Sequence, residues 1–180
     1  MTLLARRLTP TDAEAYVPLR RAMLEQEPLA FLASPGDDRA SRLEFLRERL
    51  ADTESAVFGA FAPQLIGAVG VYRQAPHKVA HKIGIWGMFV LPEHRGRGVA
   101  RQLMQLALAH ARSLPDVLQV TLSVSDTQPV ARRLYESLGF RVWGSEPQAL
   151  RHEGRVAIEH HMALPLGSLP TTPADSTPAL

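Results

Sequence analysis

A short segment rich in glycine and arginine separates an apolar stretch from a run typical of a helix. It reads Arg95-Gly96-Arg97-Gly98-Val99-Ala100-Arg101. The first turn of a helix has backbone N–H groups without intrahelical partners and lies at the positive end of the helix dipole, so it binds phosphate well. The two glycines leave the backbone open to a ligand, and the three arginines add positive charge. The segment therefore predicts a binding site for a diphosphate.

Two common phosphate-binding motifs do not fit this segment. A dinucleotide fingerprint needs the spacing G-x-G-x-x-G, which fails here, and a P-loop needs a Gly-Lys-Ser/Thr sequence that does not follow. By itself, the segment fits a solvated turn between a strand and a helix about as well as it fits a phosphate site.

Hydrophobic periodicity predicts the elements that hold this segment in place. The order strand-helix-helix-strand-strand-strand-helix-strand-helix-strand-strand indicates an α/β (α+β) domain, a mixed sheet flanked by helices, over residues 1–164. Strands are expected at Leu3–Leu8, Ala56–Ala62, Gln64–Tyr72, Lys82–Val90, Gln119–Val124, from Phe140 onward and at Arg155–Leu164. Helices are expected after the capping boxes Thr11–Glu14 and Ser41–Glu44, and at Gly98–Ser113 and Pro129–Leu138.

Two smaller features add to this outline. Gly84 and Gly87 interrupt the strand at 82–90, which favours a bulge or the close approach of a ligand. Residues 165–180 are rich in Pro, Ser and Thr and have little to bury, so we expect a disordered tail.

Composition narrows the classes of function. The chain has no cysteine, which excludes disulfides, thiolate metal sites and a cysteine nucleophile. It has no apolar run of about 20 residues, and its first ten residues lack the apolar core of a secretory signal, so we expect a cytoplasmic protein without a membrane partner. The arginines are interleaved with acids and form no long basic run, which argues against a nucleic-acid partner.

Two motifs together resemble the GNAT superfamily of acyl-CoA-dependent N-acetyltransferases. The segment at 95–100 is similar to the family's R/Q-x-x-G-x-G/A motif, and Ala131–Phe140, which reads ARRLYESLGF, resembles its A-x-x-L-Y-E-x-L-G-F segment. The motifs lie in the family's order, with a helix and a strand between them. The resemblance covers roughly Leu3 to Leu164 and is strongest from Trp86 to Trp143.

The resemblance implies a mostly antiparallel sheet whose fourth and fifth strands splay apart around acetyl-CoA, the co-substrate. Backbone groups on the fourth strand would pair with the pantetheine arm, one N–H near Phe89 or Val90 would polarise the thioester carbonyl, and residues 96–101 would bind the pyrophosphate. The implied cofactor-binding residues are Met88, Phe89, Val90, Arg95, Gly96, Arg97, Gly98, Val99, Ala100, Arg101 and Gln128.

The resemblance also implies a mechanism. Tyr135 matches the tyrosine that acts as general acid toward the departing thiolate, and the amine attacks the thioester directly in a ternary complex. Two positions depart from the family. Gln128 stands where the family often has an asparagine that contacts the pantetheine arm, and Ser123 stands where some relatives have a glutamate base.

The general base stays open at this stage. Candidates are Glu25, His81, Glu146, Glu159, His160 and His161, although a surface or packed position is the more frequent role for a histidine. Adjacent residues on a strand face opposite ways, so the pair at 160–161 is no metal signature, and we expect no metal site.

The resemblance places acceptor recognition in the first two helices and the final strands. These regions contain both acids and arginines, so their charge does not select an acceptor. We expect a small-molecule primary amine. The alternatives are a protein lysine or N-terminal acetyltransferase and a non-catalytic acyl-CoA-binding sensor. A homodimer is also expected, because dimers are common in the family.

Overall fold

The computed structural model describes residues 3–167, so the expected tail lies outside the described residues from 168 onward. Within this range, seven strands and four helices follow one another in the predicted order. The strands are β1 (Leu4–Arg7), β2 (Ala56–Phe61), β3 (Leu65–Arg73), β4 (Lys82–Val90), β5 (Gln119–Ser125), β6 (Arg141–His152) and β7 (Arg155–Pro165). The helices are α1 (Ala13–Gln26), α2 (Leu43–Ala51), α3 (Val99–Ser113) and α4 (Pro129–Ser137).

The seven strands form one sheet in the order β1-β2-β3-β4-β5-β7-β6. Every neighbouring pair is antiparallel except β4 and β5, which run parallel. A parallel pair requires a crossover connection, and α3 supplies it. The mixed, mostly antiparallel sheet flanked by helices is confirmed.

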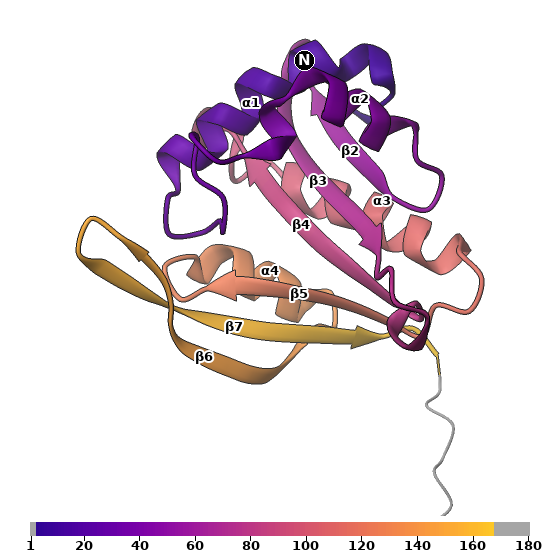
Figure 1. Cartoon of the computed structure of the whole chain (residues 1–180), viewed down its shortest axis with the longest axis vertical. Coiled ribbons are helices and arrows are strands. Elements are labelled where there is room, and N and C mark those ends of the chain that lie inside the picture. The colour runs from indigo at the N-terminus through magenta and orange to yellow at the C-terminus, as the bar shows by residue number, and fades with distance from the viewer. Residues whose placement is uncertain (1–2, 168–180) are drawn as a thin grey trace, which may run out of the picture.

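The sheet opens between β4 and β5, as Figure 1 shows. Three residue pairs join these strands, from Lys82 opposite Gln119 to Gly84 opposite Thr121. Beyond them β4 runs on to Val90 without pairing to β5, so the predicted splay is present.

A bulge in β4 lies inside this opening. Phe89 pairs with Ala68 and Trp86 pairs with Gly70, so Gly87 and Met88 together face a single residue of β3. Gly87 adopts a φ of +60°, which L side chains rarely accept, and this explains why a glycine stands there. The bulge expected from the glycines of this strand is confirmed at Gly87.

The two faces of the sheet are covered by different helices. One apolar cluster contains residues of α3 together with Tyr135 of α4, and a second contains residues of α1 and α2. Figure 1 shows α1 and α2 on the viewer's side of the sheet and α3 behind it. None of the helices in residues 3–167 is long and apolar enough to cross a membrane.

The starts of the first two helices differ from the predicted capping boxes. α1 begins at Ala13 after a short turn in which Asp12 accepts a hydrogen bond from the Thr9 amide at 2.8 Å. α2 begins at Leu43, and Ser41 does not cap it, because its hydroxyl donates to Asp38 at 2.6 Å. The Thr11 hydroxyl lies 2.8 Å from the Thr9 hydroxyl, so neither Thr11 nor Ser41 forms the predicted capping box.

Candidate active site

A cavity of about 700 Å³ occupies the opening between β4 and β5. Its walls come from the end of α1, both splayed strands, the loop before α3, and α4. Tyr135 lines it together with all of the residues predicted to bind the cofactor except Arg97: Met88, Phe89, Val90, Arg95, Gly96, Gly98, Val99, Ala100, Arg101 and Gln128.

The glycine loop and the start of α3 form one end of the cavity. Gly98 is the N-cap of α3 with a φ of +80°, and Gly96 has a φ of +73°. Both values lie in the left-handed region, where glycine is favoured, and a Cβ at either position would meet no atom within 4 Å. The loop therefore needs glycine for its conformation and leaves open space in front of its backbone.

The first turn of α3 keeps its donors free of side-chain caps. No side chain of the described residues caps this helix, and its first backbone hydrogen bond runs from the Gln102 amide to the Gly98 carbonyl at 3.1 Å. The amides of Val99, Ala100 and Arg101 precede that bond and border the cavity. Such a turn provides the backbone donors and positive dipole end that an anion needs.

The arginines of the loop do not all point into the cavity. Arg95 donates from Nε to the Val90 carbonyl at 2.8 Å and forms an ion pair with Glu27 at 3.0 Å. Arg101 donates to the Ser137 hydroxyl at 2.7 Å. Arg97 is exposed and lies outside the cavity wall. Arg95 therefore fixes the loop to the end of β4, a role that the sequence did not reveal.

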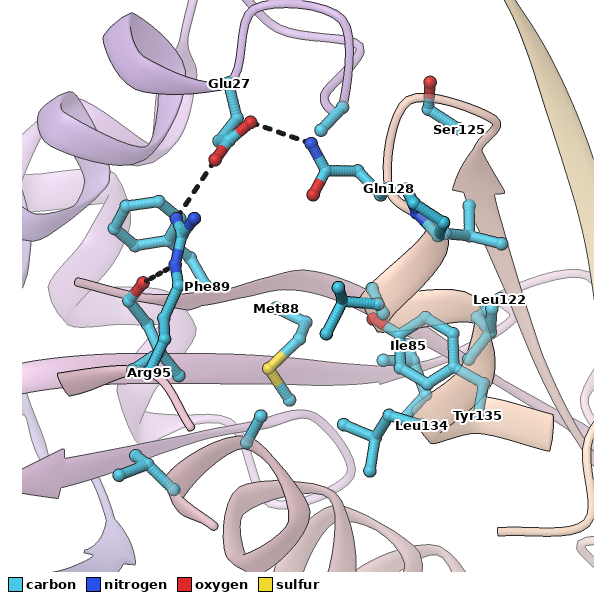
Figure 2. A pocket seen from close by; sticks show the side chains of 18 of the residues that line it. Glu27, Ile85, Met88, Phe89, Arg95, Leu122, Ser125, Gln128, Leu134 and Tyr135 are labelled. Carbon is cyan, nitrogen blue, oxygen red and sulfur yellow. Dashed lines mark hydrogen bonds and ion pairs between the residues drawn. The ribbon is translucent and has the colours of Figure 1, made fainter. Parts of the chain in front are cut away.

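Glu27 connects the two walls of the cavity, as Figure 2 shows. One carboxylate oxygen pairs with Arg95, and the other accepts a hydrogen bond from Gln128 Nε2 at 2.7 Å. The sequence placed Glu27 only among the acids of the expected acceptor region, and it did not predict this bridge. The only signal for Glu27 was its place at the end of the first helix, since its partners lie 68 or more positions away in the chain.

Tyr135 lies in the wall formed by α4. Its side chain is buried, with 5% exposed, and its ring meets the Phe140 ring edge-on with centroids 6.1 Å apart. Among residues 3–167, no hydrogen bond to its hydroxyl contributes to its pKa shift. Burial raises the pKa of the Tyr135 hydroxyl well above the ordinary value for tyrosine, so this group stays protonated at neutral pH.

The candidate bases are distributed over both faces of the sheet. His161 Nδ1 lies 2.8 Å from the hydroxyl of Ser123, which lines the cavity, and its Nε2 lies 3.4 Å from Glu146. His160 lies instead beside Ser145 and Arg132. Glu25 is exposed and paired with Arg21, away from the cavity wall.

A buried ion pair joins α1 to the segment before α2, beside the cavity. Arg20 donates two hydrogen bonds to Asp38, at 3.1 and 2.9 Å, and the two side chains are 7% and 4% exposed. The Arg20 guanidinium also lies over the rings of Phe31 and Trp86, which both line the cavity. This pair therefore holds two aromatic side chains in the wall.

Comparison with known proteins shows which family the sequence matches. The model of the acetyltransferase (GNAT) family matches residues 19–140. The mycothiol acetyltransferase of Thermobispora bispora is 33% identical over 138 residues, which is 73% of this chain and 44% of that protein. The spermidine N(1)-acetyltransferase of Vibrio cholerae is 33% identical over 60 residues, 33% of this chain and 35% of that protein. This chain thus matches less than half the length of either relative.

The fold also matches solved structures. A putative acetyltransferase from Salmonella typhimurium, solved with its cofactor acetyl-CoA, superposes with a TM-score of 0.80 and 20% identity. The match covers 97% of this chain and all of that one. Because the family model spans most of the chain and coincides with the splayed strands and their cavity, the protein belongs to the acetyltransferase (GNAT) family.

Proposed function

We propose that this protein transfers an acetyl group from acetyl-CoA to a primary amine of a small molecule, with Tyr135 as the general acid. The observation that carries this proposal is one continuous cavity between β4 and β5 that runs from the uncapped start of α3 to Tyr135. Such a cavity can hold an extended thioester with its anionic end at the helix and its reactive end at the tyrosine.

The start of α3 suits the diphosphate of the donor. The amides of Val99, Ala100 and Arg101 donate to its oxygens, and the loop glycines at 96 and 98 let it approach the backbone closely. Arg101 adds positive charge beside them. Arg95 contributes by position more than by direct contact, because Val90 and Glu27 already bind it.

The free edge of β4 suits the pantetheine arm. Beyond Gly84 the edge of β4 that faces β5 has no strand partner among the described residues, so its N–H and C=O groups can pair with an extended chain. Met88, Phe89 and Val90 supply those groups. The bulge at Gly87 turns the backbone just before them, and an N–H there polarises the thioester carbonyl.

Tyr135 protonates the departing thiolate. Its buried hydroxyl borders the cavity and remains in its acid form because burial raises its pKa. Attack by the amine and loss of the thiolate then take place in one ternary complex. The chain has no cysteine to carry a thioester intermediate.

The acceptor is proposed to be a small amine. The two relatives named above are, by their names, acetyltransferases of the small molecules mycothiol and spermidine. Phe31 and Trp86 in the cavity wall provide apolar contact and aromatic faces. A cationic or aromatic amine fits these groups better than a polyanionic acceptor does.

An acceptor screen with acetyl-CoA tests this function. Thiol release should accelerate with one class of small primary amines and stay slow with lysine peptides and N-terminal peptides. Fast turnover of peptides would contradict the small-molecule acceptor and indicate a protein acceptor. Tight binding of acetyl-CoA without turnover of any acceptor would identify a sensor, and failure to bind coenzyme A would refute the proposal.

A further inference from the structure

A chain of three polar side chains leads away from the cavity along the adjacent strands. Ser123 of β5 lines the cavity, and its hydroxyl lies 2.8 Å from Nδ1 of His161 on β7. Nε2 of the same imidazole lies 3.4 Å from Oε2 of Glu146 on β6. Strand register creates this arrangement, because Ser123 pairs directly with His161 in the β5–β7 ladder.

The surroundings of His161 hold its ring in a defined orientation. The Trp143 ring stacks on it with centroids 5.4 Å apart and an interplanar angle of 26°. A carboxylate can only accept hydrogen bonds, so Glu146 favours the tautomer with its proton on Nε2. The lone pair of Nδ1 then faces the Ser123 hydroxyl, which donates to it.

We propose that His161, acting through the Ser123 hydroxyl, takes the proton that the acceptor amine loses during acetyl transfer. This inference rests on the proposed function and supplies the base that the sequence left open. An alkylamine must lose a proton to become a stable amide, and a neutral imidazole is the side chain best suited to accept one near neutral pH. Ser123 is the residue that touches the amine, and His161 acts behind it.

The proton transfers balance without any further reactant. As the amine nitrogen bonds to the acetyl carbon, its N–H proton passes to the Ser123 oxygen while the Ser123 proton passes to His161 Nδ1. The serine is therefore unchanged, and the imidazole becomes an imidazolium. The carbon–sulfur bond breaks, and the thiolate takes the proton of Tyr135. The imidazolium then releases its proton to solvent, and the Tyr135 phenolate takes one proton back from solvent.

Two carboxylates lie beside His161. The titratable groups that face it are Glu146 from β6 and Glu159 from its own strand, and β5 contributes only the neutral Ser123. One polar side-chain atom from each of Glu146, Glu159 and His161 lies within 4.8 Å of the others. The His161 side chain is 27% exposed, so the proton can leave to solvent after each turnover.

The adjacent histidine provides a matched control. His160 lies on the same strand but faces the opposite side of the sheet, where its ring nitrogens lie 2.8 Å from the Ser145 hydroxyl and 3.3 Å from Arg132. Neither histidine lines the cavity itself, and of the two only His161 contacts Ser123, which does line it. His160→Gln therefore changes the same residue type at the same depth in β7 and leaves the proposed relay intact.

The kinetic test compares His161→Gln, Ser123→Ala and His160→Gln with the best amine from the acceptor screen. We expect His161→Gln to lower kcat at pH 7 by ~10²-fold, within the usual range for proton-transfer catalysis, with the KM for acetyl-CoA changed less than twofold. The wild-type kcat profile should have an acid limb that disappears in His161→Gln and persists in His160→Gln. Persistence of the limb in His161→Gln, or equal losses in both histidine variants, would overturn the relay.

A second measurement does not depend on turnover. Nitrogen-15 NMR of the seven histidines, with the His161 signal identified by its loss in His161→Gln, gives the position of the imidazole proton. The relay requires the proton on Nε2 at high pH and a shift of the Nδ1 signal in Ser123→Ala. A proton on Nδ1 would refute the relay even if no acceptor were found, whereas absent turnover with the expected tautomer would count against the proposed function alone.

Discussion

Gln128 Nε2 donates a hydrogen bond to Glu27 Oε2 at 2.7 Å and so joins the end of α1 to the start of α4 across the mouth of the cavity. The same carboxylate pairs with Arg95 at 3.0 Å. Figure 2 shows Glu27 between these two partners. One side chain thus positions two residues proposed to bind the donor, although it comes from the end of α1, where acceptor recognition is proposed. Glu27 therefore connects the proposed acceptor region to the proposed donor site.

Glu27→Ala should raise the KM for acetyl-CoA by roughly 2- to 10-fold, because Gln128 and Arg95 lose the contacts that orient them. This factor corresponds to the free energy of one or two hydrogen bonds. Stability should fall by only about 1 kcal/mol or less, because the Arg95 side chain is 44% exposed and solvent screens the pair. Steady-state kinetics and thermal unfolding measure the two effects. Glu25→Ala removes an exposed pair with Arg21 at the same end of α1 and should alter neither.

Gly98→Ala should weaken coenzyme A binding and cost roughly 1–2 kcal/mol of stability, because alanine must adopt the left-handed φ of +80° at the N-cap of α3. Isothermal titration and denaturant unfolding provide the readouts. Gly36→Ala is the control, since that loop glycine has no left-handed φ and its Cβ would meet no atom within 4 Å. Equal losses of affinity and stability in both variants would contradict a specific role for the left-handed conformation of the loop.

Tyr135→Phe should lower kcat by about 10²- to 10⁴-fold and leave the Kd for coenzyme A within twofold of wild type. The fold should be little affected, because among residues 3–167 no hydrogen bond to the hydroxyl contributes to its pKa shift. Tyr72→Phe, on β3 and outside the cavity wall, is the control and should retain activity. A comparable loss of affinity and turnover in Tyr135→Phe would contradict its role as an acid.

The raised pKa of Tyr135 also predicts a pH dependence. Burial disfavours the phenolate, so the folded pKa lies above the ordinary value of about 10 and the hydroxyl stays in its acid form up to at least that pH. The wild-type kcat should therefore show no alkaline limb from this group below about pH 10. Stability should decline above that pH, where tyrosine ionises in the unfolded chain but not in the folded one.

Asp38→Asn should destabilise the protein by about 3–5 kcal/mol, because it leaves the buried charge of Arg20 without its partner. Burial by itself raises the pKa of Asp38, but hydrogen bonds from Arg20 and Ser41 outweigh it and place the pKa below the ordinary aspartate value. The wild-type pair should therefore stabilise the fold fully above about pH 4 and lose this effect as pH falls through the lowered pKa. Urea unfolding at several pH values measures it, and a loss below 1 kcal/mol in Asp38→Asn would contradict the buried pair.

The local features of this protein follow from its sequence. The loop at 95–101 is contiguous, so its glycines, its arginines and the start of the helix can be recognised together without knowing any distant contact. The helices and strands likewise follow from apolar periodicity, which depends on neighbours a few positions apart. The boundaries of β4, Lys82–Val90, coincide with the prediction because glycine-containing and polar turns bound a short apolar run.

Contacts between distant segments were decided only by the tertiary structure. The bridge from Glu27 to Gln128 and Arg95 depends on how α1 sits over the splay, which no local pattern specifies. Alternation along a strand requires His160 and His161 to face opposite ways, but it does not say which one lies beside Ser123. That choice follows from the register of β7 against β5, because a shift of one residue would bring His160 to Ser123 in place of His161.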